Sequence, residues 1–191
     1  MSVQTISSQS ESVQASAVQA SALALSKPVL NINAQGVAVT ELQNLLNGYA
    51  NYLQTASGNS NPFNSFRVIV DGKFGNDTLK AVKAFQRQVF LPRTGTVANL
   101  TWQALYLRGP VNMPTIQLSS TGNFVKLLEE ALFQVNELAS SQVNTTFGTS
   151  TRAAVMNYQS LPTRGLTVDG IVGAATWFSL SKQYRPLGIF N

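Results

Sequence analysis

The chain contains one sequence motif twice. Four residues of the first copy recur 73 positions later: Gly75 as Gly148, Thr78 as Thr151, Val82 as Val155 and Gln86 as Gln159. Four matches at a single offset are not expected by chance, and an internal repeat constrains the fold more strongly than composition does. The repeat therefore predicts a tandem pair of binding modules rather than a domain built around a single catalytic pocket.

Both copies carry the three- and four-residue spacing of apolar side chains that indicates amphipathic helices. In the first copy these stripes run over residues 39–49, 79–89 and 102–106, and in the second over residues 125–132, 155–158 and 177–180. The sequence is therefore predicted to be all-α, with two tandem three-helix domains.

The predicted organisation has four parts. Residues 1–27 are a Ser/Gln/Ala-rich arm, 28–109 the first domain, 114–182 the second domain and 183–191 a C-terminal tail. Gly75 follows Gly36 by 39 residues, whereas Gly148 follows Gly122 by 26, so the first copy holds 13 more residues, which fall in the region 51–67. Loops tolerate insertions at small entropic cost, so we expect a loop at residues 56–64 and an unchanged core.

Several residues are expected to set the helix boundaries. Asn76 and Thr149 are expected to cap the middle helices of the two copies. Gly75 and Gly148 are expected to permit a tight backbone turn before those helices. Pro162 is expected to end the middle helix of the second copy, because proline is not tolerated in a helix interior.

The composition excludes the commonest catalytic and metal-binding chemistry. The chain has no cysteine and no histidine, which removes disulfides, Ser-His-Asp and Cys-His catalysis and the usual zinc ligands. Among the eight acidic residues, the neighbours Glu129 and Glu130 would diverge on a helix. Asp71 with Asp77 is the only other nearby pair, and a glycosidase needs two carboxylates across a cleft. We therefore expect no enzymatic activity, no cofactor and no metal.

The composition also bears on the location of the protein. No segment is apolar enough to span a membrane, and residues 1–27 lack the basic start and unbroken apolar core of a secretory signal peptide. Charged residues make up only 11% of the chain, and Ser, Thr, Asn and Gln supply most of the polar surface. This profile is typical of secreted, wall-associated or virion proteins, so we expect the cell envelope, the extracellular space or a virion.

The two copies follow a recognisable residue pattern. The first copy has Gly36, Val39, Leu42, Gln43 and Leu46, then Asp71, Gly72, Phe74, Gly75, Thr78, Ala81, Val82, Phe85 and Gln86, then Gly95, Thr101, Trp102 and Leu105. The second copy has Asn144-Thr145 for Asp-Gly, Glu129 for the first glutamine and Tyr158 for the phenylalanine. This pattern resembles the peptidoglycan-binding domain of bacterial and phage cell-wall enzymes. The resemblance implies a compact three-helix fold that holds cell-wall glycan or stem peptide in a shallow surface groove.

The resemblance makes twelve residues candidates for ligand contact: Asp71, Asn76, Phe85, Gln86, Arg87, Asn99, Trp102, Gln103, Tyr158, Gln159, Asp169 and Trp177. Many of these also have a structural interpretation. The tryptophans are expected in the core, the aspartates before glycine are expected to close turns, and Gln86 and Gln159 are expected to form buried hydrogen bonds. Polar recognition would then fall to the residues that flank this framework: Asn76, Arg87, Asn99 and Gln103.

Lys80, Lys83 and Arg87 form the only local cluster of basic residues in a chain of formal net charge +5. They lie beside an apolar stripe, so they form either a solvated helix face or a surface that attracts a polyanion such as a cell-wall polymer. A nucleic-acid partner would need a denser basic stripe and base-stacking aromatic residues, so none is expected.

Two functions follow from the sequence. The leading hypothesis is a non-catalytic cell-wall protein whose two modules bind peptidoglycan. The alternative is a structural subunit of an extracellular fibre, sheath or virion, in which the modules are a scaffold and residues 1–27 mediate self-assembly. Head-to-tail insertion of such an arm grows open filaments unless the contacts close into a ring.

Overall fold

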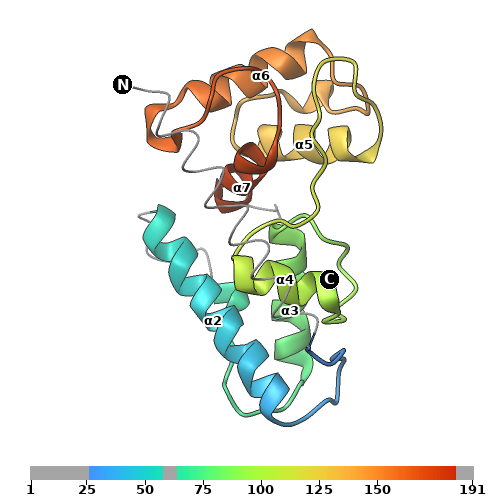
Figure 1. Ribbon diagram of the computed structural model, residues 1–191, viewed down its shortest axis with the longest axis vertical. Coiled ribbons are helices and arrows are strands. Elements are labelled where there is room, and N and C mark those ends of the chain that lie inside the picture. Colours follow the sequence, from blue (N-terminus) through green and yellow to red (C-terminus); the bar gives the residue numbers. More distant parts are fainter. Residues whose placement is uncertain (1–25, 58–63, 184–191) are drawn as a thin grey trace. The chain divides into compact units, whose positions relative to one another are not determined.

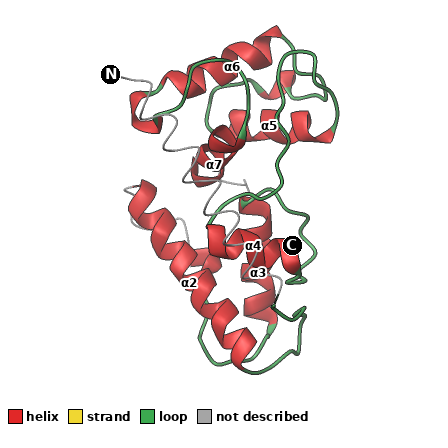
Figure 2. Ribbon diagram, in the orientation of Figure 1, coloured by secondary structure: helices red, strands yellow, loops and turns green. Residues whose placement is uncertain are grey.

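The structure is a computed structural model that describes residues 26–57 and 64–183. In this part of the chain every regular element is a helix, as the sequence predicts (Figure 1, Figure 2). The chain divides into two compact units between Val111 and Asn112. The predicted arm lies outside the described residues except for Ser26 and Lys27, and so does the predicted tail except for Gln183.

The described part of the first unit consists of three α-helices and a short 3-10 helix. In chain order these are α2 (Val37–Ser57), η1 (Asn64–Phe66), α3 (Asn76–Gln88) and α4 (Asn99–Leu107). Helix α2 packs against α3 and α4, and η1 contacts both α2 and α3. The predicted apolar stripes meet in one core: Val39, Leu42, Leu46, Val82, Phe85, Trp102 and Leu105. Burial of these side chains is the main favourable contribution to folding of the unit.

The second unit repeats this order of helices and adds a second 3-10 helix. They are α5 (Asn123–Gln134), η2 (Ser140–Gln142), α6 (Thr149–Ser160), η3 (Pro162–Arg164) and α7 (Ala174–Gln183). Helix α5 packs against α6. The buried side chains include Val125, Leu128, Leu132, Phe147, Val155, Tyr158, Trp177 and Leu180. Helix α6 ends two residues before Pro162, which confirms the predicted boundary.

An extended lead-in segment closes each unit by pairing with loops of the same unit. Four antiparallel backbone bridges make these contacts: Leu30 with Val97, Gln35 with Lys73, Ile116 with Val172 and Thr121 with Thr146. The buried Trp102 donates its indole N–H to the carbonyl of Pro28 at 2.9 Å, and Trp177 donates to the carbonyl of Pro114 at 2.8 Å. The tryptophans are core residues, as predicted, and they also bind the lead-in segments to the cores.

The helix starts differ from the sequence prediction by one residue. Asn76 and Thr149 are the first residues of α3 and α6, and Gly75 and Gly148 hold the N-cap positions. The predicted caps are therefore wrong. Both glycines have extended backbone, with φ of −89° and −88°, and Ala98 takes the same conformation before α4. The tight turn predicted at these glycines is therefore also wrong, and glycine stands there as a residue that an N-cap accepts well.

The insertion in the first copy is partly helical. Helix α2 continues to Ser57 and has 21 residues, whereas α5 has 12. The predicted loop at residues 56–64 is therefore wrong at its start, and residues 58–63 lie outside the described residues. The added turns bury Leu53, and η1 buries Phe66. The insertion thus extends the core instead of leaving it unchanged.

Tyr49 lies in the middle of this extended core. Its ring meets those of Phe66 and Phe85 edge to face, at centroid distances of 5.5 and 4.8 Å. The side chain is fully buried, and its hydroxyl has no hydrogen-bond partner within the described ranges. Burial raises the pKa of Tyr49 well above its ordinary value.

We expect Tyr49→Phe to stabilise the protein. The substitution keeps the ring contacts and removes a hydroxyl whose burial without a partner costs about 1–3 kcal/mol. Tyr106→Phe is the matched control, because the Tyr106 hydroxyl donates to Oε1 of Glu41 at 2.6 Å and its loss should lower the melting temperature. Thermal unfolding followed by circular dichroism measures both variants. A lower melting temperature for Tyr49→Phe would mean that the buried hydroxyl has a partner.

Candidate functional site

Four buried helix residues, which we call clamp residues, each hold a turn that follows later in the chain: Gln43, Gln86, Glu129 and Gln159. The turns begin at Asp71, Thr94, Asn144 and Asp169, in that order. Several of the candidate ligand residues lie on these turns or at the starts of the helices that follow them. The clamps therefore determine where those side chains are presented.

Gln43 of α2 pairs with polar groups on both sides of its turn. Its Oε1 accepts from the backbone N–H groups of Asp71 and Gly72 at 3.1 and 2.9 Å. Its Nε2 donates to Oδ1 of Asp71 at 2.8 Å, to the carbonyl of Lys73 at 3.1 Å and to Oγ1 of Thr78 at 3.3 Å. Buried polar groups need such partners, so this amide holds the turn together with the bridge between Gln35 and Lys73.

Gln86 of α3 and Gln159 of α6 repeat this arrangement. Gln86 accepts from the N–H of Gly95 at 2.9 Å. Gln159 accepts from the N–H of Gly170 at 2.9 Å and donates to the carbonyl of Ile171 at 2.8 Å. The predicted buried hydrogen bonds of both glutamines are confirmed.

Glu129 of α5 holds its turn as an acceptor. Its Oε2 accepts from the N–H of Asn144 at 2.6 Å, and its Oε1 accepts from the hydroxyl of Thr151 at 2.6 Å. In the first module the amide of Gln43 faces the carboxylate of Asp71. In the second module the carboxyl group is on the helix and the uncharged Asn144 is on the turn, so two carboxyl groups never face each other. Glu129 bonds to the backbone of Asn144, while the side chain of Asn144 donates to the carbonyl of Gln142 and accepts from the N–H of Thr146.

The aspartates that begin two of the turns also close them. Oδ1 of Asp71 accepts from the N–H of Lys73 at 2.9 Å, and Oδ1 of Asp169 accepts from the N–H of Ile171 at 2.8 Å. These are Asx turns, so the predicted role of both residues as turn carboxylates is confirmed. The hydrogen bond from Gln43, followed by that from the N–H of Lys73, holds the pKa of Asp71 below its ordinary value.

The structure separates the twelve candidate ligand residues into two groups. Seven are buried within the modules: Phe85, Gln86, Trp102, Gln103, Tyr158, Gln159 and Trp177. Five reach the surface to different extents: Asp71, Asn76, Arg87, Asn99 and Asp169. The first group shapes the framework from inside, and the second lies where a ligand has access. Ligand contact by any of the twelve stays a prediction.

The tyrosine that replaces a phenylalanine in the second copy has partners of its own. The hydroxyl of Tyr158 lies 2.9 Å from Oγ of Ser179, and the guanidinium carbon of Arg164 lies 3.5 Å from the centre of the ring. Burial raises the pKa of Tyr158, although the hydrogen bond to Ser179 and the charge of Arg164 oppose this. These contacts explain how a polar aromatic residue fits this core position.

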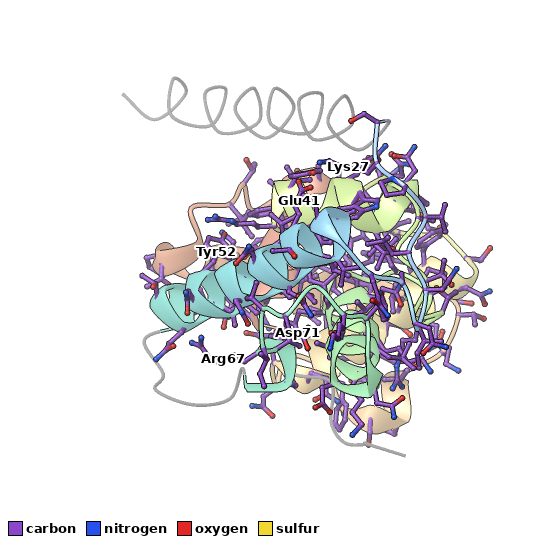
Figure 3. The ribbon with its side chains drawn as sticks, turned by 90° about the horizontal axis from the view of Figure 1, so that it is seen from below. Lys27, Glu41, Tyr52, Arg67 and Asp71 are labelled. Atoms are coloured by element: carbon purple, nitrogen blue, oxygen red, sulfur yellow. The ribbon has the colours of Figure 1, made fainter. Side chains whose placement is uncertain are left out.

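One cluster beside the framework is not among the predicted site residues. Nζ of Lys27 lies 2.6 Å from Oε2 of Glu41, and the hydroxyl of Tyr106 donates to Oε1 of the same carboxylate. Partial burial opposes ionisation of Glu41, but the hydrogen bonds from Lys27 and Tyr106 outweigh it and hold the pKa of Glu41 below its ordinary value. Figure 3 shows Lys27 and Glu41 together, and Asp71 apart from them. No sequence spacing signals this cluster, because its members come from three separate segments.

The described residues contain no group of three or more acidic, histidine or cysteine side chains that could hold a metal ion. Over the same ranges, none of the helices combines the length and the apolar character that a membrane span requires. The side chains that reach the surface around the turns are amides, carboxylates and a guanidinium, which are suited to polar recognition.

Comparison with known proteins gives one family. The family model described as "Putative peptidoglycan binding domain" matches the chain twice, at residues 35–105 and 121–180. The two matches together span more than half of the chain and coincide with the two copies of the motif. No curated protein and no solved structure matches the chain.

We expect Gln43→Glu to destabilise the first module and Asp71→Asn to restore part of the loss. A glutamate at this buried position loses the donor for the carbonyl of Lys73, which should lower the free energy of unfolding by about 1–3 kcal/mol. Its carboxylate would also face that of Asp71, whereas the double variant copies the Glu129–Asn144 pair. Chemical denaturation of the four proteins in a double-mutant cycle measures the coupling. Strictly additive effects would contradict the paired exchange.

Proposed function

Because the chain belongs to the peptidoglycan-binding domain family, we propose that it is a non-catalytic protein whose two tandem modules bind peptidoglycan. The observation that carries the proposal is the family match in both copies. The ligand is the glycan strand or the stem peptide. The setting is the cell envelope, the extracellular space or a virion that meets a cell wall.

We take residues 28–109 and 114–182 as the two modules. Each has clamp residues on its first and second helices and a tryptophan bonded to the carbonyl of a lead-in proline. These shared features support a second module that is intact despite its altered motif. Two weak sites on one chain gain strongly by avidity when both reach the same polymer.

The contact surface of the first module centres on exposed polar side chains beside the clamped turns. Asn76 and Asn99 are the first residues of α3 and α4, and each stands five residues after the start of a clamped turn. Both are exposed, and the clamped backbone holds them in fixed positions. Side-chain amides donate and accept hydrogen bonds, so they match the hydroxyl and amide groups of peptidoglycan.

The carboxyl groups near the turns support a binding role. Asp71 and Asp169 close their own turns, and Glu129 is buried under its turn. Glu41 is engaged by Lys27 and a tyrosine. A hydrolase of glycosidic bonds needs two carboxyl groups that flank the scissile bond, whereas these groups are used to build the framework.

The full chain is expected to co-sediment with purified insoluble peptidoglycan at low salt. Asn76→Ala/Asn99→Ala should weaken binding about fivefold or more, because each amide contributes a hydrogen bond worth about 0.5–1.5 kcal/mol. Asn44→Ala is the control, since Asn44 is an exposed amide of the same type within α2 and not at the start of a helix. Absence of co-sedimentation would contradict the proposed binding, and a falling turbidity of the wall suspension would contradict the non-catalytic role.

A second candidate function is a structural subunit that polymerises through its N-terminal arm. The observation that favours it is the attachment of the last residue of the arm, and of the residue after it, to the first module. Lys27 forms an ion pair with Glu41 at 2.6 Å, and the carbonyl of Pro28 accepts from Trp102. An arm fixed at its base to one module is suited to reach a neighbouring subunit.

Deletion of residues 1–25 tests this second function. The deletion leaves Lys27 and Pro28 in place, so the module should unfold at an unchanged temperature. If the arm links subunits, light scattering should show large particles for the full chain and monomers for the truncated chain. Assemblies of equal size from both proteins would rule out the arm as the linker.

A further inference from the structure

The two modules differ strongly in charge. Residues 28–109 contain seven basic and three acidic residues, whereas residues 114–182 contain four of each. The clamps, the lead-in bridges and the buried tryptophans are common to both modules. The excess positive charge is therefore a property of the first module's surface and is not required by the fold.

Part of this excess lies on one face of α3. Lys80, Lys83 and Arg87 are three and four residues apart, so they follow one side of the helix at axial steps of about 4.5 and 6 Å. Asp77 is the only carboxylate in this helix. Its Oδ1 lies 3.7 Å from Nζ of Lys80, and both side chains are largely exposed. An exposed pair of this kind interacts weakly, so the charge of Lys80 is little reduced.

The stem of Lys83 packs against the second clamped turn. Gly95 has a φ of +76°, and a Cβ atom at this position would lie 3.0 Å from Cε of Lys83 and 2.4 Å from Cδ1 of Leu79. The absence of a side chain at Gly95 therefore lets the lysine lie close to the turn. A cation whose stem is already ordered loses less conformational entropy when it binds a ligand.

The equivalent positions of α6 are neutral: Ala153, Met156 and Ser160. A Cβ atom at Gly170 would lie 3.2 Å from Cγ of Met156, so Met156 packs on its turn as Lys83 does. One basic residue, Arg152, lies on this side of the turn. Since a methionine satisfies the packing, the charge of Lys83 is not needed for the framework.

We propose that the basic face of α3, formed by Lys80, Lys83 and Arg87, binds a linear polyanion of the cell wall through its phosphate or carboxylate groups. A row of cations at regular steps is complementary to a chain of repeating negative groups, and their contact releases counterions. The proposal takes its cell-wall setting from the proposed function. Its ligand is a polymer attached to the wall, and its cations continue along α3 from Asn76 of the proposed peptidoglycan contact.

Nucleic acid is a poorer match for this face. Single strands are held by aromatic side chains on which the bases stack. None of the strongly exposed apolar side chains in the described part of the first module is aromatic. Duplex binding depends on a larger number of phosphate contacts than three side chains provide.

The test uses the full chain with two soluble probes, long-chain inorganic polyphosphate and polyglutamate, in titrations followed by fluorescence anisotropy. Lys80→Gln/Lys83→Gln should weaken binding of the preferred probe roughly tenfold or more at low ionic strength. The difference should disappear at high salt, because exposed charges are screened. Lys126→Gln/Arg152→Gln removes the same charge from the second module and should change the affinity less than about twofold.

Each outcome decides the proposal. Preference for polyphosphate would identify phosphate as the bound group, and preference for polyglutamate would identify carboxylate. Either result supports the site. Tighter binding of duplex DNA than of both probes, no binding of either probe, or equal losses in the two variants would overturn it. Both variants should retain the melting temperature of the unmodified chain. Lys80→Gln/Lys83→Gln should still co-sediment with peptidoglycan stripped of attached polymers, which separates this test from that of the proposed function.

Discussion

The structure depends on pairing the polar backbone of four turns that lie against hydrophobic cores. One buried side chain on a helix does this for each turn, and Gln43 reaches 28 residues along the chain to Asp71. The next helix always begins five residues after the first residue of the turn. A threonine two residues into that helix, such as Thr78, bonds to the same clamp. The clamp therefore fixes the turn, the start of the helix and the orientation of its first side chains together.

The constraint acts on the pattern of donors and acceptors and leaves the residue types free to change. In the first module Gln43 both donates and accepts hydrogen bonds. At the equivalent position of the second module Glu129 only accepts them, and Asn144 stands where the first module has Asp71. The polar core residue Tyr158 is likewise accompanied by a hydroxyl and a cation that satisfy it. The second motif therefore departs from the first at positions whose changed side chains still have hydrogen-bond partners.

The features that the sequence predicts correctly are local or repeated. Apolar spacing identified the helices, the repeat identified two modules, and the Asp-Gly pair at Asp71 identified a turn. The N-cap of α3 is not predicted correctly, because Asn76 and its neighbour Gly75 are both residues that an N-cap accepts. The cluster around Glu41 is not predicted either, because long-range contacts leave no spacing in the sequence. Gln43 is part of the motif, but its role is clear only from its hydrogen-bond partners, which lie 28 to 35 residues away in the sequence.

A repeat whose matched residues are mostly buried says more about folding than about ligands. Gln86 and Trp102 recur as Gln159 and Trp177 because each fills or clamps a core. Differences in recognition between the modules must then arise at positions that the repeat leaves unmatched. The outer face of α3 is such a position. Met156 of α6 packs against its turn as Lys83 does in α3, so the charge of Lys83 is free to serve a ligand. Charge on this face, carried by a framework common to both modules, is therefore where their functions diverge.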